Sequence, residues 1–248
     1  MLWKSLAGRC IYRSDNMRVF DNYFFRWLKF NSNAFQSLLN KHAPHRPALN
    51  YVKALTFAAR QLPGDTCMLG LGGASVAHTL APRLHSGTLT AVEMNAEVID
   101  VATHYFMVDK LKNLVIVHDE AHHFIKHCQQ NFKHLLIDIS DANSFPSSCN
   151  NKEFFIHCAR LISNQGILAI NIANAYEHQA IFSMLQQQFG NNIITIPVKR
   201  CVNIIFIATF KDNFNHLIHY FKNTKEVKQL IWDKKWGCMA NLRYGTFF

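Results

Sequence analysis

The stretch from Thr66 to Leu80, TCMLGLGGASVAHTL, constrains the fold of this chain more than any other part of it. It contains an apolar segment of strand length, then a glycine-rich turn, then the beginning of a helix near Ser75. Gly70, Gly72 and Gly73 allow the backbone to turn sharply and to approach a ligand closely. The free N–H groups at the start of the helix would face that ligand. Because similar turns also occur without ligands, the interpretation depends on the residues downstream.

An acidic residue ends each of the three apolar segments that follow as strands. LTAVE ends in Glu93, NLVIVHD ends in Asp119 and HLLID ends in Asp138. The carboxyl ends of parallel strands meet at one edge of a sheet, where Rossmann-like folds bind the hydroxyls and base of a nucleoside. The order of the glycine turn and the three acids therefore predicts a nucleoside site at this edge.

The remaining pattern alternates strands with helices over most of the chain. Strands are expected near 66–70, 88–93, 113–117, 134–138 and 166–172, with helices near 75–84, 95–106, 120–130, 151–162 and 176–188. Such alternation indicates a parallel sheet covered by helices on both faces. NIITIPV and VNIIFIATF follow with only a short link between them, so these two strands must be antiparallel. The pattern predicts an α/β, Rossmann-like fold with a class I methyltransferase-type seven-stranded sheet, built from five parallel α/β units and a terminal antiparallel hairpin.

The two ends of the chain differ from this alternating pattern. Residues 10–40 are rich in aromatic and β-branched residues and predict two or three antiparallel strands in a small N-terminal sheet. The proline-bounded segment HAPHRP precedes a helix through NYVKALTFAARQL. We therefore expect a small β domain over 1–46 and a nucleoside-binding catalytic domain over 47–248. The tail from Asn213 is expected to be helical to about Trp232 and irregular beyond it.

Composition indicates a chain that buries a core and stays out of membranes. The 248 residues are 49% hydrophobic and 17% charged, which distinguishes the chain from a disordered one. No apolar run is long enough to span a membrane, and the N-terminal residues lack the continuous apolar region of a signal peptide. The seven cysteines are scattered and odd in number, as is typical of reduced thiols. We expect a cytoplasmic protein.

The chain is strongly basic, with a formal net charge of +10 and fourteen histidines in addition. A positive balance favours anionic partners, such as nucleic acid, acidic lipid or phosphorylated substrates. The lysines and arginines are spread along the chain, however, which favours a generally basic surface. Nucleic acid stays open as a partner, and so does a homodimer formed through the β-rich N-terminal segment.

The first two strand-end acids each allow two interpretations. Glu93 could accept both hydroxyls of a ribose or could cap the helix that begins near Asn95; its distance from the glycine turn favours the ribose. Asp119, together with Glu120, could accept a hydrogen bond from the amino group of an adenine. It could equally cap the helix over 120–130, and the sequence does not decide between the two.

The segment DISD, from Asp138 to Asp141, is the most informative polar cluster. Two carboxylates three residues apart could hold a cationic amine, and one of them could remove a proton as that amine attacks. The long polar loop ANSFPSSCNN follows, as expected of a loop over a substrate, although a locally capped turn is the alternative. His123 and His127, with the adjacent Cys128, lack the remaining ligands of a zinc site, so we expect a solvated helix face and no metal.

These motifs together resemble one known family. MLGLGGAS, LTAVEMNAEVIDVA, VHDEAHHFIK and LLIDISD are similar to successive motifs of the spermidine synthase (polyamine aminopropyltransferase) family. FQSLL and Tyr51 in NYVKAL also resemble the N-terminal domain of that family. The resemblance extends over roughly residues 16 to 210.

The resemblance implies a transferase and assigns a role to each polar residue of the motifs. Gly70, Gly72, Gly73, Glu93, Asp119 and Glu120 would bind the nucleoside, with Glu93 at the ribose and Asp119 at the adenine of decarboxylated S-adenosylmethionine or methylthioadenosine. Asp138 would be the general base. Asp141 and Tyr51 would bind the attacking amine, a polyamine such as putrescine. Displacement at the carbon beside the sulfonium would give methylthioadenosine and a longer polyamine without a metal.

Three departures from the family pattern keep other functions open. Gly73 stands where the family has an aspartate that grips the aminopropyl ammonium, Tyr51-Val52-Lys53 replaces a more polar motif, and Ala142-Asn143-Ser144-Phe145 replaces a Pro-x-Gly-Pro loop. The first alternative is an S-adenosylmethionine-dependent methyltransferase, because Gly73 removes an acid that would face the carboxylate of the intact cofactor. The second is a non-catalytic basic binding protein that retains the fold.

Overall fold

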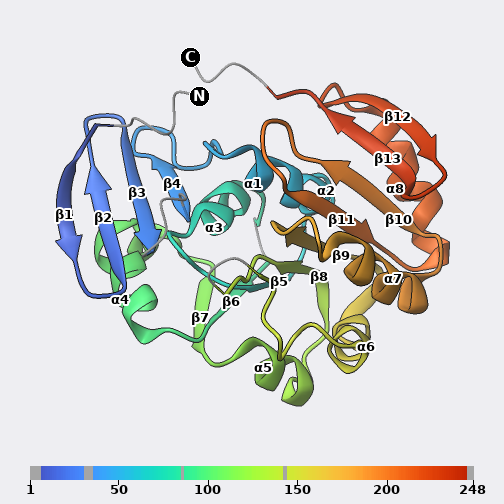
Figure 1. Ribbon diagram of the computed structural model, residues 1–248, viewed down its shortest axis with the longest axis horizontal. Helices are drawn as coiled ribbons and strands as arrows, with labels where there is room; N and C mark the ends of the chain where they lie inside the picture. The colour runs from blue at the N-terminus through green and yellow to red at the C-terminus, as the bar shows by residue number, and fades with distance from the viewer. Residues whose placement is uncertain (1–6, 31–35, 85–86, 142–143, 245–248) are drawn as a thin grey trace.

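The computed structural model describes residues 7–30, 36–84, 87–141 and 144–244, which form two sheets with helices packed around the larger one (Figure 1). Some expectations fall outside these residues. They are the expectation of no signal peptide where it concerns residues 1–6, part of the β-rich segment at residues 31–35, and the first two loop residues, Ala142 and Asn143.

The N-terminal sheet contains four antiparallel strands in chain order, β1 (Arg9–Arg13), β2 (Met17–Asp21), β3 (Phe25–Phe30) and β4 (Ser37–Asn40). This is one strand more than the two or three expected. One face of the sheet buries Val19 and Leu28 against Val101 of the helix α4 (Ala96–Tyr105) and Phe106 at its C-cap. The small sheet is therefore packed directly on the larger unit, at the left of Figure 1.

The central sheet has the predicted topology and two further strands. Its order is β12-β13-β10-β11-β9-β8-β5-β6-β7. The five α/β units supply β5 (Thr66–Leu69), β6 (Leu89–Glu93), β7 (Leu114–His118), β8 (Phe132–Ile137) and β9 (Ile162–Ile172), all parallel. The hairpin of β10 (Ile193–Pro197) and β11 (Ile204–Ala208) places β11 antiparallel between β10 and β9. The expected α/β, methyltransferase-type sheet is confirmed.

Helices cover both faces of the central sheet because its strands are buried on both sides. One apolar cluster joins the strands to α1 (Asn50–Leu55), α2 (Phe57–Gln61), α3 (Ser75–Leu80) and α8 (Lys211–Asn223). The other joins them to α5 (Ala121–His127), α6 (Lys152–Arg160) and α7 (His178–Phe189), and α4 (Ala96–Tyr105) lies beside the N-terminal sheet. Successive residues of β5 alternate between the two clusters. Among the residues described, no helix combines the length and apolarity needed to cross a bilayer.

The expectation that the tail is helical to about Trp232 is wrong beyond α8. The helix ends at Asn223, and the chain then forms the hairpin β12 (Val227–Asp233) and β13 (Gly237–Leu242). Asp233 accepts hydrogen bonds of 2.8 Å from the N–H groups of Lys235 and Trp236, and Gly237 adopts a positive φ of 66°. This turn stabilises an antiparallel pair. β13 then joins β10 in parallel, which extends the sheet beyond the seven expected strands.

Candidate active site

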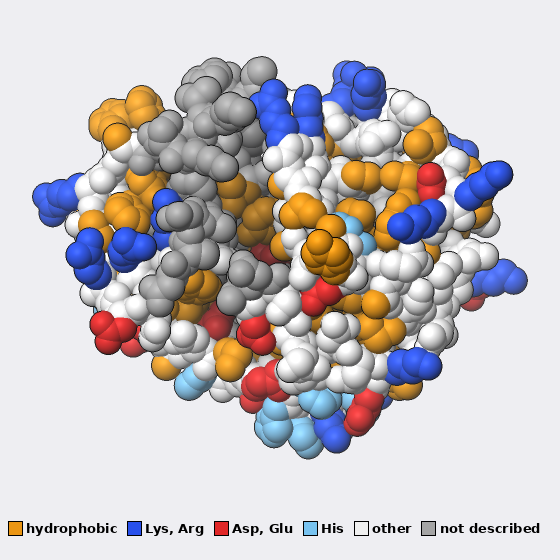
Figure 2. Space-filling model, in the orientation of Figure 1, with side chains coloured by type: hydrophobic (Ala, Val, Ile, Leu, Met, Phe, Trp, Pro, Cys, Tyr) orange, Lys and Arg blue, Asp and Glu red, His pale blue; other side chains and the backbone are white. Residues whose placement is uncertain are grey.

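The carboxyl edge of the parallel strands brings the predicted residues together. The registers of β8, β5 and β6 place Asp138, Gly70 and Glu93 in one row across adjacent strands. Backbone hydrogen bonds continue the ladders into this row: Asp138 N–H donates to Leu69 O at 2.9 Å, and Gly70 N–H donates to Val92 O at 2.8 Å. Figure 2 shows acidic side chains gathered in the middle of this face.

The glycine turn is packed tightly against its neighbours. Gly70 adopts a φ of +89°, and a Cβ there would lie 2.3 Å from the carbonyl oxygen of Asp138. A Cβ on Gly73 would lie 2.7 Å from the Cβ of Ser37 and 2.9 Å from the Phe106 ring. The N–H of Gly73 donates to Ser37 Oγ at 2.8 Å. The turn is thus held by β4, and position 73 has no room for a side chain in this arrangement.

Glu93 lies at the end of β6 and connects the glycine turn to the following helix. Its Oε2 accepts from the N–H of Leu71 and its Oε1 accepts from the N–H of Asn95, both at 3.0 Å. The capping of α4 is done by Asn95, whose side chain accepts from Glu97 N–H at 2.9 Å. A carboxylate has about four acceptor positions, so the half-buried Glu93 retains capacity for ribose hydroxyls.

The sequence left open whether Asp119 caps the helix over 120–130 or accepts from an adenine. In the structure the cap is Glu120, because its carboxylate accepts from His123 N–H at 2.8 Å, and it also accepts from the Ser148 hydroxyl at 3.1 Å. Asp119 accepts from the N–H of Glu120 at 2.8 Å, and His123 Nδ1 lies 2.9 Å from its Oδ1. Asp119 N–H donates to the carbonyl of Glu93 at 3.2 Å, so these two acids are neighbours.

The Asp138 carboxylate is fixed by a hydrogen bond from a neighbouring strand. Asn171 Nδ2 donates to its Oδ1 at 2.9 Å, and Asn203 Nδ2 donates to Asn171 Oδ1 at 2.8 Å. The Tyr51 hydroxyl donates to the carbonyl of Gln36 at 3.2 Å, and it also lies close enough to Asp138 to affect the pKa of that carboxyl. Burial raises the pKa of Asp138, and the Asn171 hydrogen bond and the nearby Tyr51 hydroxyl offset only part of this rise. Burial and the Asp138 charge raise the pKa of Tyr51 well above its usual range.

Asp141 begins a tight turn in front of this cluster. Its N–H and carbonyl exchange 2.8 Å hydrogen bonds with Ser144, as the alternative of a local turn predicted. The Asp141 side chain is exposed and makes no hydrogen bond within the part of the chain that the structure describes. The loop packs against the rest of the protein at the buried Phe145, whose N–H donates to Glu177 at 3.0 Å.

The histidines of α5 lie on the surface. His123 and His127 are exposed, with ring centroids 4.4 Å apart. Over residues 7–30, 36–84, 87–141 and 144–244, no group of three or more His, Cys, Asp or Glu side chains is arranged to hold a metal ion.

Four residues that touch the site were not expected from the sequence: Ser37, Asn171, Glu177 and Asn203. Asn171 carried a signal, since it lies near the end of the fifth parallel strand as the acids do in the strands before it. Ser37 and Asn203 carried none, because they come from segments far away in sequence.

Comparison with known proteins identifies the family to which the chain is similar. A family model described as the spermine/spermidine synthase domain matches residues 68–227. The polyamine aminopropyltransferase of Neisseria meningitidis is 25% identical over 188 residues, which cover 74% of this chain and 72% of the relative.

Solved structures share the fold at low sequence identity. A probable spermidine synthase from Corynebacterium glutamicum superposes with a TM-score of 0.67 at 17% identity, covering 83% of this chain and 81% of that one. A spermidine synthase in complex with the transition-state analogue AdoDATO has a TM-score of 0.61 at 15% identity, with coverage of 81% and 73%. Human methyltransferase-like protein 13 in complex with SAH has a TM-score of 0.59 at 14% identity, with coverage of 76% and 97%.

Proposed function

The chain belongs to the spermine/spermidine synthase family and is a transferase, and from this premise we propose that it transfers an aminopropyl group to an amine such as putrescine. The donor would be decarboxylated S-adenosylmethionine. The observation that carries the proposal is the position of Asp138, which lies in one row with Glu93 and is held by Asn171, with Tyr51 beside it.

We propose that the nucleoside lies along the carboxyl edge of β5, β6 and β7. Glu93 would accept the two ribose hydroxyls with the acceptor positions that its backbone contacts leave free. Asp119 would accept from the adenine amino group, with Glu120 fixing the start of α5 beside it. Gly70, Gly72 and Gly73 would let the sulfur end of the ligand lie close to the backbone.

Asp138 would act as the general base. The amine nitrogen attacks the carbon beside the sulfonium, the carbon–sulfur bond breaks, and its electron pair returns to sulfur as a neutral thioether. The nitrogen passes its surplus proton to the Asp138 carboxylate, and methylthioadenosine leaves. A carboxyl with a raised pKa is a stronger base than an ordinary one, which suits this step.

Asp141 and Tyr51 would bind the amine on either side of the base. The exposed Asp141 carboxylate offers a counter-charge to an ammonium group at the entrance. Tyr51 lies beside the Asp138 carboxylate, with its hydroxyl bound to the carbonyl of Gln36, and would border the amine. The spacing of two carboxylates along the loop suits a substrate with more than one ammonium group.

Methyl transfer from intact S-adenosylmethionine is the second candidate. The observation that favours it is Gly73, which packs against Ser37 and Phe106 and contributes no acid to the turn. The fold is also shared with human methyltransferase-like protein 13, whose structure contains SAH.

Titration of the pure protein with S-adenosylmethionine, its decarboxylated form and methylthioadenosine separates the candidates. Aminopropyl transfer predicts tighter binding of the decarboxylated form, followed by release of methylthioadenosine when putrescine is added. Tighter binding of the intact form would contradict aminopropyl transfer and support methyl transfer. If none of the three binds, both candidates fail.

A further inference from the structure

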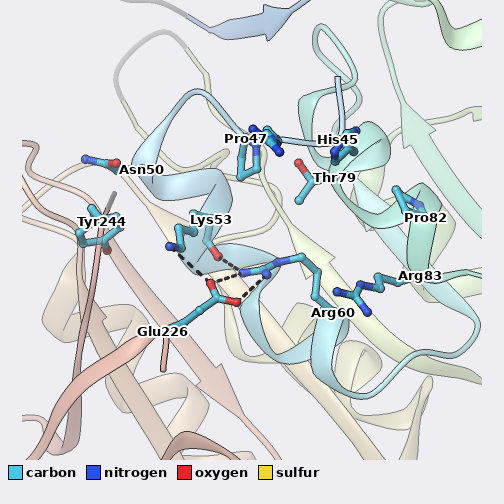
Figure 3. A pocket seen from close by; sticks show the side chains of 11 residues that line it. His45, Pro47, Asn50, Lys53, Arg60, Thr79, Pro82, Arg83, Glu226 and Tyr244 are labelled. Atoms are coloured by element: carbon cyan, nitrogen blue, oxygen red, sulfur yellow. Dashed lines mark hydrogen bonds and ion pairs between the residues drawn. The ribbon is translucent and has the colours of Figure 1, made fainter. Parts of the chain in front are cut away.

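A basic cavity is lined by none of the residues assigned to the proposed reaction (Figure 3). Its volume is about 480 Å³, and it lies between α1, α2, the 3₁₀ turn η2 (Ala81–Arg83) and the segments that flank the β12–β13 hairpin. We propose that this cavity binds a small anion carrying two or more phosphate groups. The volume lies within the range of small-molecule sites.

The charge of the cavity wall is strongly unbalanced. Four cationic side chains, Arg46, Lys53, Arg60 and Arg83, line it together with a single carboxylate, that of Glu226. His45 also lines the cavity and would add a further positive charge when protonated. Low-dielectric walls around charges of one sign concentrate counter-ions of the other sign. The wall therefore favours an anion that carries more than one charge.

The single acid fixes two of the cations in place. Glu226 accepts from both terminal nitrogens of Arg60, at 3.0 and 3.1 Å, and lies 3.4 Å from Lys53 Nζ. Burial raises the pKa of Glu226, but the hydrogen bonds and charges of Arg60 and Lys53 lower it more, so the net shift is downward. Glu226 thus stays ionised and already has cationic partners, as the dashed lines of Figure 3 show.

The other two cations have no such partner. Arg46 and Arg83 are exposed, and neither forms an ion pair with any residue in the described part of the chain. They come from different segments, the proline-bounded joint before α1 and the turn after α3, yet they line one cavity. Guanidinium groups bind phosphate with two parallel hydrogen bonds, which makes arginine suited to this ligand.

The concave shape selects among anions. A nucleic acid backbone is followed by an extended groove or stripe of positive charge. Here the cations surround a half-open hollow of small-molecule size, and Tyr244 and Pro47 contribute part of its wall. The shape therefore favours a compact phosphate ester or pyrophosphate over a polymer.

Inorganic pyrophosphate is the probe that tests this site without engaging the nucleoside site, because it has no base or ribose. Calorimetric titration of the wild-type protein should show saturable binding. The double variant Arg46→Gln/Arg83→Gln should bind at least about tenfold more weakly. Both side chains are exposed, so the variant should unfold at the wild-type temperature, which a thermal melt checks.

Arg13→Gln is the matched control for each single variant, Arg46→Gln and Arg83→Gln, since Arg13 is an exposed arginine on β1 that does not line the cavity. It removes a positive charge and should leave pyrophosphate binding unchanged. The proposal fails if the wild type shows no saturable binding, or if Arg13→Gln weakens binding as much as each single variant does. It also fails if a single-stranded oligonucleotide binds while pyrophosphate does not compete with it. None of these results bears on aminopropyl transfer.

Discussion

The side-chain amide of Asn171 donates a 2.9 Å hydrogen bond to the carboxylate of Asp138, across the boundary between β9 and β8. This bond favours the ionised form of Asp138 and opposes the effect of burial on its pKa. Asn203 orients the amide by donating to its oxygen at 2.8 Å. Burial therefore raises the basicity of the proposed catalytic carboxylate, and a residue that does not itself carry charge moderates it.

Asn171→Ala should shift the acidic limb of the pH–rate profile upward. Loss of the amide donor removes an interaction that lowers the pKa of Asp138, so the carboxylate becomes protonated at a higher pH than in the wild type. The measurement is kcat/KM for methylthioadenosine release from pH 5 to 9. Asn203→Ala, which leaves the donor on Asp138, should produce a smaller shift. An unchanged acidic limb in Asn171→Ala would show that Asn171 does not lower the pKa of Asp138.

Glu93→Gln should weaken nucleoside binding by about tenfold or more. The amide would direct an N–H₂ group at one of the two backbone N–H groups that the carboxylate now accepts, and it loses charge-assisted bonds to the ribose. Titration with methylthioadenosine measures the effect. Glu97→Gln is the control, because Glu97 accepts from the Tyr12 hydroxyl at 2.8 Å on the side of the N-terminal sheet. Equal losses in both variants would contradict the ribose assignment.

Gly73→Ala should destabilise the fold by about 1–3 kcal/mol. The new methyl group would lie 2.7 Å from Ser37 Cβ and 2.9 Å from Phe106 Cε1, so β4 or the ring must move. Urea denaturation measures the change. The double variant Ser37→Gly/Gly73→Ala removes one of the two clashes and should be less destabilised than the sum of the single variants. Strict additivity would show that Ser37 does not restrict position 73.

Much of the fold follows from the sequence because each strand of an α/β unit can be recognised from a short stretch of residues. The apolar run through β5, the glycines after it and the acid at the end of β6 are all encoded within about thirty residues. Because these patterns are local, the sequence alone places Glu93, Asp119 and Asp138 at one edge of the sheet. Parallel strands joined by helices always end on the same side.

The parts that the sequence did not predict depend on contacts between distant segments. β12 was expected as helix because its apolar residues follow an amphipathic helix, and only the turn from Asp233 to Gly237 distinguishes a hairpin from a continued helix. Ser37 meets Gly73, and Asn203 meets Asn171, through packing that no local pattern encodes. The cavity at Arg46 and Arg83 is likewise assembled from segments that are neighbours only after folding.

His134 should make the protein sensitive to mild acid. Its side chain is buried and contacts the carbonyl of Leu62, and burial lowers its pKa to about 4. The ordinary histidine pKa of about 6.5 applies in the unfolded chain, so the unfolded state binds more protons between these two values. The contribution of His134 to the free energy of unfolding is therefore fully present above about pH 6.5. It falls by about 3 kcal/mol as the pH is lowered toward 4.

The free energy of unfolding in urea, measured from pH 7 to pH 4, tests this expectation. His134→Gln should be less stable than the wild type at pH 7, with a shallower loss of stability as the pH falls. Parallel curves for the two proteins would show that His134 does not titrate as burial requires. The difference between the curves cancels contributions from carboxylates such as Glu226, which both proteins share.

The most direct test of the account is a comparison of Asp138→Asn with the wild type for binding and for turnover. Asparagine preserves the size of the side chain and removes its ability to accept a proton. The account predicts that Asp138→Asn binds methylthioadenosine with an affinity close to that of the wild type. Release of methylthioadenosine from decarboxylated S-adenosylmethionine and putrescine should fall by about 100-fold or more. Unchanged turnover in Asp138→Asn would contradict the assignment of the general base and, with it, the proposed mechanism.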